Sequence, residues 1–194
     1  MGLTIMILGL VLFLGIHALT TRRELRARLI ASVGEGGYKV GYALVSLAGL
    51  VLIAKGFADY RAAGQIEIWQ PPAAFKYITE ALMLPAVILV VASYIRGRIY
   101  TTLKHPMLAG VKLWAAAHLI ANGDLGSIIL FGSFLGWAVF DRISLKRRTD
   151  GGAPPIPVGG VSNDAIAILM GILIYLALAL VFHPVVIGVP VFGV

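Results

Sequence analysis

The chain has 194 residues, no cysteine and a net charge of +7, and 59% of its residues are hydrophobic while only 13% are charged. Soluble domains carry roughly 25% charged residues, so this composition excludes a soluble globular domain and indicates a protein whose solvent is lipid. The absence of cysteine excludes disulfides, thiolate metal sites and cysteine nucleophiles. The positive charge lies between apolar runs, which favours membrane topology and lipid headgroups over nucleic acid as its explanation.

Six apolar runs follow one another along the chain, each close to the length that a helix needs to cross a hydrocarbon core of ~30 Å. Arginines follow the first run and none precedes it, the reverse of a signal peptide. The third run contains Pro85, where we expect a kink. The fourth run carries Lys112 and His118, so we expect it to face the bundle interior rather than lipid. The predicted spans are 2–19, 40–57, 78–94, 106–121, 125–140 and 165–182.

Glycine and proline mark the predicted breaks between these spans. Gly36-Gly37 precedes the second span, and Asn122-Gly123-Asp124 predicts a tight turn between the fourth and the fifth. Gly151–Gly160, which contains three prolines, predicts a flexible linker before the last span. The sequence therefore predicts a single all-α domain over residues 1–194, a polytopic membrane bundle of about six transmembrane helices.

The basic residues predict the orientation of this bundle. Twelve lie in the connections after the first, third and fifth spans, and three lie on the opposite side. Because cytoplasmic loops are enriched in Lys and Arg, we expect both termini to face the periplasm of a bacterial inner membrane. The twelve are Arg22, Arg23, Arg26, Arg28, Lys39, Arg96, Arg98, Lys104, Arg142, Lys146, Arg147 and Arg148.

Histidines at membrane depth are the candidates for chemistry, because ionisable groups are expensive there. In a chain without cysteine, imidazole is the natural axial donor to a haem iron. Two axial ligands need a similar depth, which His17 and His105 share on the cytoplasmic side. His105 and His118 lie thirteen residues apart on one helix, ~20 Å along its axis, and do not meet this condition. The alternative for each is a hydrogen-bonded interfacial histidine, the interpretation we favour for His183.

Two further polar residues accompany these histidines. Lys112 follows His105 by one heptad and shares its helix face, where it could pair with a haem propionate or a substrate anion. The alternative is a lysine that snorkels or forms an ion pair within the bundle. Asn122 lies one turn after His118 and Trp114 one turn before it, so the three predict a polar and aromatic helix face.

Several stretches resemble the NnrU family. The most specific is Lys104–Gly110 with its continuation Leu113–Asp124, and Gly15–His17 and Trp137–Arg142 match the first and fifth helices of that family. NnrU proteins are bacterial inner-membrane proteins associated with nitrite and nitric oxide reduction. They are similar to zeta-carotene isomerase, a membrane enzyme with haem b. The resemblance therefore implies a haem b protein linked to denitrification, or isomerase-like chemistry on an apolar substrate.

The resemblance also implies roles for individual residues. The two proposed haem ligands of the isomerase correspond to His17 and His118, and its conserved His-Pro corresponds to His105. The isomerase has a cysteine, proposed to exchange onto the iron, where this chain has Ala115, so the resemblance does not extend to a ligand switch. Depth pairs His17 with His105 and the resemblance pairs it with His118; both pairings stay open.

Two alternatives remain. Lys104–Gly110 also resembles the start of the cofactor region of membrane isoprenylcysteine methyltransferases, but Asp141–Leu145 lacks the paired glutamates that follow it there, which disfavours methyl transfer. The chain could instead be a non-catalytic membrane subunit or assembly factor of a respiratory complex. The expected partners are the lipid bilayer and either an apolar small molecule or a respiratory membrane protein, and the sequence assigns no catalytic residue.

Overall fold

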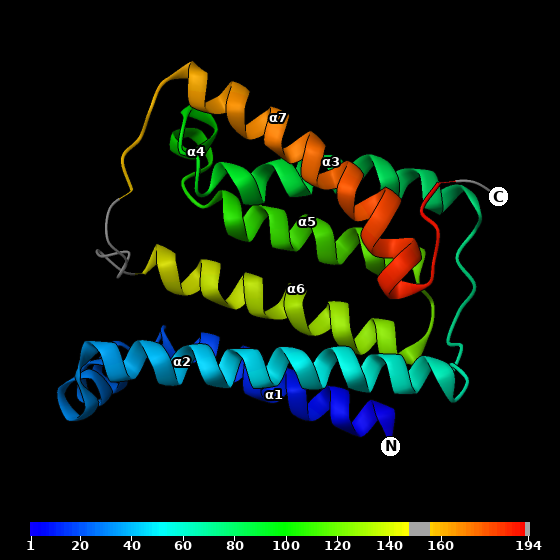
Figure 1. Ribbon diagram of the computed structural model, residues 1–194, viewed down its shortest axis with the longest axis horizontal. Coiled ribbons are helices and arrows are strands. Elements are labelled where there is room, and N and C mark those ends of the chain that lie inside the picture. The colour runs from blue at the N-terminus through cyan, green and yellow to red at the C-terminus, as the bar shows by residue number, and fades with distance from the viewer. Residues whose placement is uncertain (148–155, 193–194) are drawn as a thin grey trace. The chain divides into compact units, whose positions relative to one another are not determined.

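The computed structural model describes residues 1–147 and 156–192, and its regular elements are helices (Figure 1). This confirms the all-α prediction. Arg148 and part of the predicted linker Gly151–Gly160 lie outside the described residues. The elements are α1 (Gly2–Leu19), α2 (Arg23–Ala62), α3 (Ala74–Ala92), α4 (Arg98–Leu103), α5 (Pro106–Ala121), α6 (Leu125–Lys146), α7 (Val161–Ala177) and the π-helix η1 (Leu178–Ile187).

Five helices in the described part of the chain are long and apolar enough to cross a bilayer: α1, α2, α3, α6 and α7 with η1. A sixth, α5, is apolar but has only 16 residues, or ~24 Å of helix. Five of the six predicted spans lie within helices. The third, 78–94, extends two residues beyond the end of α3. Helices satisfy every backbone donor and acceptor internally, which lipid requires. The chain is therefore a multi-pass membrane protein.

Helix α2 is much longer than the predicted span 40–57, and its break lies elsewhere. The non-helical residue is Gly34, with φ 76° and ψ 164°, a conformation that essentially only glycine adopts. Gly36 and Gly37, the predicted break, are helical. An ion pair of 2.8 Å between the side chains of Glu35 and Lys39 lies across these two glycines, and such i,i+4 pairs stabilise a helix.

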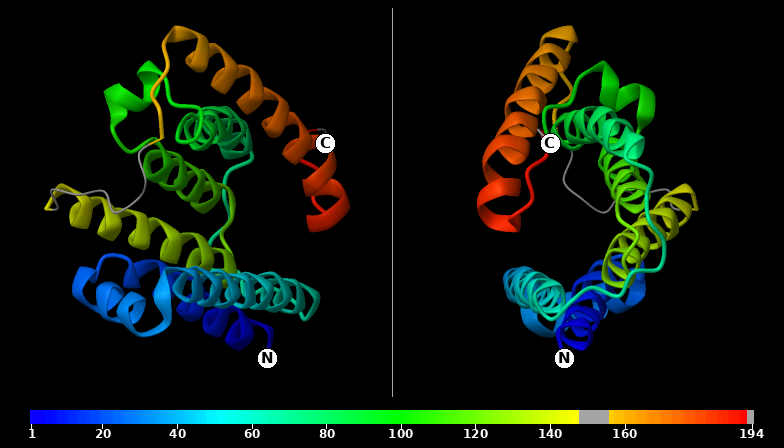
Figure 2. Two further views of the ribbon diagram at one scale, coloured as in Figure 1. Left: turned by 60° about the vertical axis from the view of Figure 1, so that its left-hand side comes forward. Right: turned by 90° about the vertical axis from the view of Figure 1, so that its right-hand side faces the viewer.

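The helices divide into two compact units, and each is described by itself (Figures 1 and 2). Unit 1 contains α1, α2 and α6, from Met1–Gln70 and the described part of Asn122–Thr149. Unit 2 contains α3, α4, α5, α7 and η1, from Pro71–Ala121 and the described part of Asp150–Val194. Since the chain passes from unit 1 to unit 2 and back, the single-domain assignment stays a prediction.

Glycines bring α1 and α2 together in unit 1. Gly2 and Gly9 of α1, seven residues apart, lie against the backbone of α2, and Gly49 and Gly56 of α2 lie against α1. A Cβ atom at Gly9 would lie 2.6 Å from the nitrogen of Ile53, so only glycine permits this approach. Small residues are the usual means of close helix packing in lipid, where dispersion contacts replace the hydrophobic effect.

In unit 1 the start of α6 is held by an N-cap side chain and by a backbone hydrogen bond to the segment that follows α2. Asp124 accepts a hydrogen bond of 2.9 Å at Oδ1 from the backbone N–H of Ser127, the N-cap arrangement. The N–H of Leu125 donates to the carbonyl of Ile66 at 2.8 Å. The chain is thus non-helical at Asn122–Asp124, as the predicted turn requires.

In unit 2, α3 packs against both α5 and α7. Gly110 of α5 lies against the carbonyl of Ala86, where a Cβ atom would be 2.7 Å from the oxygen. Thr79 of α3 donates its hydroxyl to the carbonyl of Ala117 in α5 at 2.9 Å. Gly171 of α7 lies against Ile88 of α3 in the same way. These contacts position three helices around one space, while Pro85 lies inside α3 as predicted.

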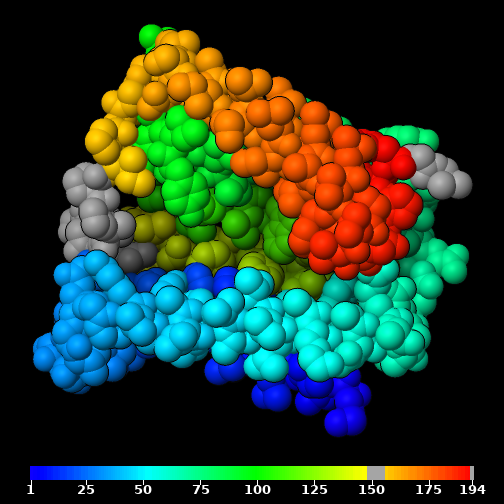
Figure 3. Space-filling model, in the orientation of Figure 1, coloured from blue at the N-terminus to red at the C-terminus, as the bar shows by residue number. Residues whose placement is uncertain are grey.

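Two side chains at the start of α7 form hydrogen bonds with the backbone of the segment that follows α3. The carboxylate of Asp164 accepts hydrogen bonds of 3.0 Å from the backbone N–H groups of Arg98 and Ile99, the first residues of α4. Asn163 donates from Nδ2 to the carbonyl of Arg96 at 2.9 Å. Beyond this end, α7 and η1 (orange to red in Figure 3) expose apolar side chains, such as Leu169, 59% exposed, which suits lipid contact.

Candidate functional site

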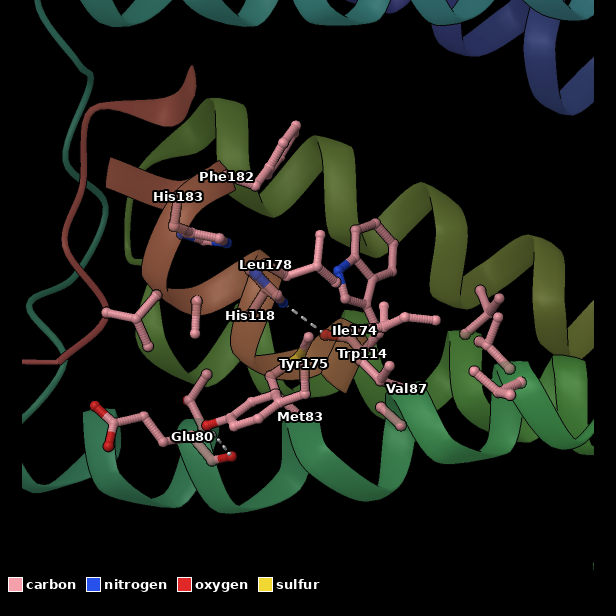
Figure 4. Close-up of a pocket in the computed structure, with 17 residues that line it drawn as sticks. Glu80, Met83, Val87, Trp114, His118, Ile174, Tyr175, Leu178, Phe182 and His183 are labelled. Carbon is pink, nitrogen blue, oxygen red and sulfur yellow. Dashed lines mark hydrogen bonds between the residues drawn. The ribbon is translucent and has the colours of Figure 1, made fainter. Parts of the chain in front are cut away.

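Unit 2 contains a half-open cavity of about 380 Å³ between α3, α5, α7 and η1 (Figure 4). Its size falls in the range of small-molecule sites, which are mostly apolar with a few polar groups that fix orientation. The polar side chains here are Thr79, Glu80, Trp114, His118, Tyr175 and His183. The other lining residues are Met83, Ala86, Val87, Val90, Val91, Val111, Ile174, Leu178, Ala179, Phe182 and Val191.

The fourth predicted span supplies the central polar group of this cavity, His118 on α5. Its Nδ1 lies 2.9 Å from the carbonyl oxygen of Trp114, one turn earlier on the same helix. Because a carbonyl can only accept, Nδ1 carries the proton and Nε2 carries the lone pair. The indole of Trp114 lies 5.4 Å away between ring centroids. A hydrogen bond of this kind fixes the tautomer and orientation of a metal-ligating histidine.

A second histidine of the same unit lines the cavity. The ring centroids of His118 and His183 are 6.2 Å apart, with 34° between the ring planes. Figure 4 shows the two rings close together and pointing toward one another. The sequence favours a hydrogen-bonded interfacial role for His183, which stays a prediction, and the structure places its side chain in the cavity wall.

The opposite wall of the cavity is formed by α3, where Tyr175 of α7 meets Glu80. The hydroxyl of Tyr175 donates to the backbone carbonyl of Glu80 at 3.3 Å. The Glu80 side chain also lines the cavity and is the acidic group nearest the predicted span cores. No group of three or more His, Asp or Glu side chains in the described residues is arranged to hold a metal ion. The donors that the cavity offers are two imidazoles, the Glu80 carboxylate, the Tyr175 hydroxyl and the Met83 thioether. Of these, imidazole is the haem ligand that the sequence indicates.

Unit 1 holds the other histidine that the resemblance singles out, His17 of α1. Its Nδ1 donates to the carbonyl of Phe13 at 2.6 Å, and the ring stacks on the Phe13 ring with centroids 4.2 Å apart. Tyr42 of α2 and Trp137 of α6 lie 5.2 Å and 5.7 Å from it. Nε1 of Trp137 is buried and has no hydrogen-bond partner among the described residues. The surroundings of His17 are thus aromatic within its own unit.

His17 and His118 share one local design. In both, an aromatic residue four positions earlier packs against the imidazole, and the carbonyl of that residue accepts the Nδ1 proton. The sequence signal is aromatic-x-x-x-His, once as Phe13–His17 and once as Trp114–His118. Side chains four apart on a helix are neighbours, which explains the spacing. Each imidazole therefore presents Nε2 away from its own helix.

Three other residues of the predicted site do not line the cavity. His105 precedes α5, between Lys104 with φ 62° and Pro106. Lys112 lies within α5 and is half-buried. Asn122 follows the end of α5 and is also half-buried. The cofactor roles expected for these three residues stay predictions.

The cavity is also lined by three residues that were not predicted from the sequence as part of a site: Thr79, Tyr175 and His183. For His183 a signal was present, because Pro184 directly follows it inside an otherwise apolar run. A proline inside a helix removes a backbone donor and disturbs the turn before it, and membrane helices tolerate it where other groups satisfy the freed backbone atoms. Thr79 and Tyr175 carry no comparable signal, since each is one hydroxyl in an apolar helix.

Comparison with known proteins gives one family. The family model described as NnrU protein matches residues 5–191, nearly the whole chain. No curated protein and no solved structure matches the chain significantly. The match includes the first helix with His17, the span with His118 and the end of η1 with His183. The chain therefore belongs to the NnrU family.

Proposed function

We propose that this NnrU-family membrane protein binds haem b in the cavity of unit 2, with His118 as a ligand of the iron. The observation that carries the proposal is the hydrogen bond from Nδ1 of His118 to the carbonyl of Trp114. This bond fixes the tautomer in which Nε2 can donate its lone pair to a metal. The same ring lines a cavity whose other walls are mainly aliphatic.

The apolar lining fits the ring of this cofactor, while the two propionates would have to lie outside the cavity, because the one charged side chain among the described lining residues is the acidic Glu80. The flat, apolar ring of a haem suits walls made of Met83, Val87, Ile174 and Leu178, and Trp114 can flank it. Covalent attachment of a c-type haem requires a Cys-x-x-Cys-His motif, and this chain has no cysteine, so the haem would be held without covalent bonds. When bound, haem supplies redox and ligand-binding chemistry at its iron.

The family resemblance supports two roles for such a site. One is a part in nitrite and nitric oxide reduction, and the other is isomerase-like chemistry on an apolar molecule. An apolar lining favours an apolar substrate or a lipid-soluble electron carrier over a charged metabolite. The location we propose is the bacterial inner membrane with both termini in the periplasm, an orientation supported by the twelve basic residues on one side of the predicted spans.

The test is the absorbance spectrum of the protein purified in detergent after expression with a haem precursor. We expect a Soret band in the wild type, loss or strong reduction of the band in His118→Ala, and its retention in His105→Ala. His105→Ala tests the pairing of His17 with His105 that depth suggests, since His105 lies in the same unit but outside the cavity, and loss of the band in this variant contradicts the proposal. A wild type without a Soret band overturns the proposal.

A colourless wild type that co-purifies with a stoichiometric respiratory protein would instead favour a non-catalytic membrane subunit. The observation behind that second candidate is the apolar, exposed surface of the helices, which a protein partner could cover as well as lipid. Examples are Leu44, 62% exposed, and Val181, 59% exposed.

A further inference from the structure

Two imidazoles line the cavity of unit 2, those of His118 and His183, and the proposed function uses only His118. His118 comes from α5, and His183 comes from η1, 65 positions later in the chain. Their ring centroids are 6.2 Å apart, and Figure 4 shows the rings pointing toward one another. Ionisable side chains are costly at membrane depth, so two imidazoles from separate helices in one apolar cavity indicate a function beyond packing.

The separation of the rings matches that of two imidazoles on one metal ion. Imidazole nitrogens bind transition metals at about 2.0–2.1 Å, so two rings on opposite sides of one ion have their centroids roughly 6 Å apart. Two rings that stack on each other, or that share a direct hydrogen bond, also have their centroids about 4.5–7 Å apart. Packed rings and metal-bound rings therefore share this separation, and the geometry of the helix that carries His183 is a second, independent observation.

The π-helix explains how His183 reaches the cavity. Tyr175, Ala179 and His183 all line it and are spaced by four residues. In a regular α-helix each step of four turns a side chain by about 40° beyond a full circle, so His183 would point roughly 80° away from Tyr175. The wider turns of η1, Leu178–Ile187, reduce this drift and keep the three residues on one face.

Pro184 favours a departure from regular α-helix at this point, although a helix can also continue through proline, as α3 does at Pro85. Pro184 has no N–H, and in an α-helix its ring would clash with the carbonyl of Leu180. The chain continues as a helix through Pro184 and ends at Gly188, whose φ of 75° is left-handed. π-helical turns are uncommon and occur frequently at functional sites. Here the unusual turn has one visible consequence, which is the placement of an imidazole beside His118.

We propose that His183 is the second axial ligand of the haem iron, opposite His118. The inference rests on the proposed function, and it deepens it by assigning both ligands to unit 2. It differs from the pairing of His17 with His118 that the family resemblance implies. It also implies that an external ligand can reach the iron only by displacing one of the two imidazoles.

The experiment is electron paramagnetic resonance of the ferric protein, purified in detergent, together with its absorbance spectrum. We expect a six-coordinate low-spin signal in the wild type. In His183→Ala the haem should remain bound through His118, whose ring is held in position by its hydrogen bond to the carbonyl of Trp114, and the signal should become high-spin. Added free imidazole should restore the low-spin signal in this variant, because it can occupy the position vacated by the side chain.

Matched variants make the assignment specific. Val185→Ala changes an exposed residue of the same π-helix that does not line the cavity, and we expect it to keep the low-spin signal. A low-spin signal that persists in His183→Ala overturns the inference while leaving the proposed function intact. Loss of the low-spin signal in His17→Ala, with His183→Ala unchanged, assigns the second ligand to unit 1 and also overturns it. A wild type without haem refutes the proposed function itself.

A second variant covers the case in which His183→Ala does not fold. His183→Met keeps a side chain of useful length and offers a thioether sulfur as the ligand. Replacement of an axial histidine by methionine raises the reduction potential of a haem. We therefore expect a more positive midpoint potential in His183→Met than in the wild type. An unchanged potential, with haem bound, contradicts the assignment of His183.

Discussion

The glycine contact between α1 and α2 gives a sharp prediction about how unit 1 is held together. In Gly9→Ala the new Cβ atom lies 2.6 Å from the nitrogen of Ile53 and 2.7 Å from the carbonyl oxygen of Gly49. Both are backbone atoms that cannot rotate away. Ordinary contacts begin near 3.4 Å, so the two helices must separate locally by roughly 0.8 Å. A gap of about 0.5–1 Å loses between a quarter and a half of each dispersion contact, and we expect destabilisation of about 1–3 kcal/mol.

The assay is thermal unfolding of the purified protein in detergent, followed by circular dichroism. The control is Gly15→Ala on the same helix, because a Cβ atom there meets nothing within 4 Å. We expect Gly9→Ala to unfold several degrees below the wild type and Gly15→Ala to unfold with it. Equal unfolding temperatures for the two variants would show that the glycines do not mediate this packing.

Two further predictions concern the loops and breaks. Asp164→Ala removes the acceptor for the N–H groups of Arg98 and Ile99; we expect a loss of about 0.5–2 kcal/mol in unfolding, as for other helix caps, and faster trypsin cleavage after Arg98. Gly34→Ala places a side chain where φ is 76° and ψ is 164°, and we expect a loss of about 1–3 kcal/mol, measured by the same thermal unfolding.

Each of these has a matched control. Asp59→Ala breaks an exposed ion pair of 2.9 Å with Lys55, which should change stability by only about 0–1 kcal/mol. If Asp59→Ala and Asp164→Ala have the same effect, the contact between α7 and the loop after α3 is not stabilising. Gly36→Ala adds a methyl group to a helical glycine with open space around it, so it should not destabilise. A Gly34→Ala variant as stable as Gly36→Ala would contradict the helix break at Gly34.

The membrane fold was largely predictable because lipid imposes one simple requirement. A spanning segment needs a long apolar run, and such runs are visible in the sequence without any knowledge of packing. The helices Gly2–Leu19 and Pro106–Ala121 have the predicted bounds. The stretch Arg23–Val33 was not predicted as helical, because its four charged residues exclude it from an apolar run and hydropathy alone gives no other signal for a helix.

The predicted position of the break in α2 is wrong, because the pair Gly36-Gly37 is a stronger local signal than the single glycine at which the break occurs. Gly36-Gly37 is the stronger local signal for a turn, yet it is helical and is spanned by the ion pair of Glu35 with Lys39. The actual break, Gly34, needs its positive φ for a change of chain direction that only the three-dimensional structure shows.

The candidate site was predictable in part. The polarity of the fourth span pointed to His118, and the Trp114 that accompanies it was visible one turn away. The cavity itself could not be predicted, since its walls come from α3, α5, α7 and η1, which are distant in sequence. The role of His183 depends on the π-helical turns that bring it beside His118, and hydrophobic periodicity does not reveal such turns.

The haem content per chain of the purified wild type and of His118→Ala tests the central claim most directly. A pyridine haemochrome assay identifies the haem as type b and gives its stoichiometry. The account predicts one haem b per chain in the wild type, little or none in His118→Ala, and a wild-type amount in His105→Ala. A wild type without haem, or a His118→Ala variant that retains it fully, would contradict the account.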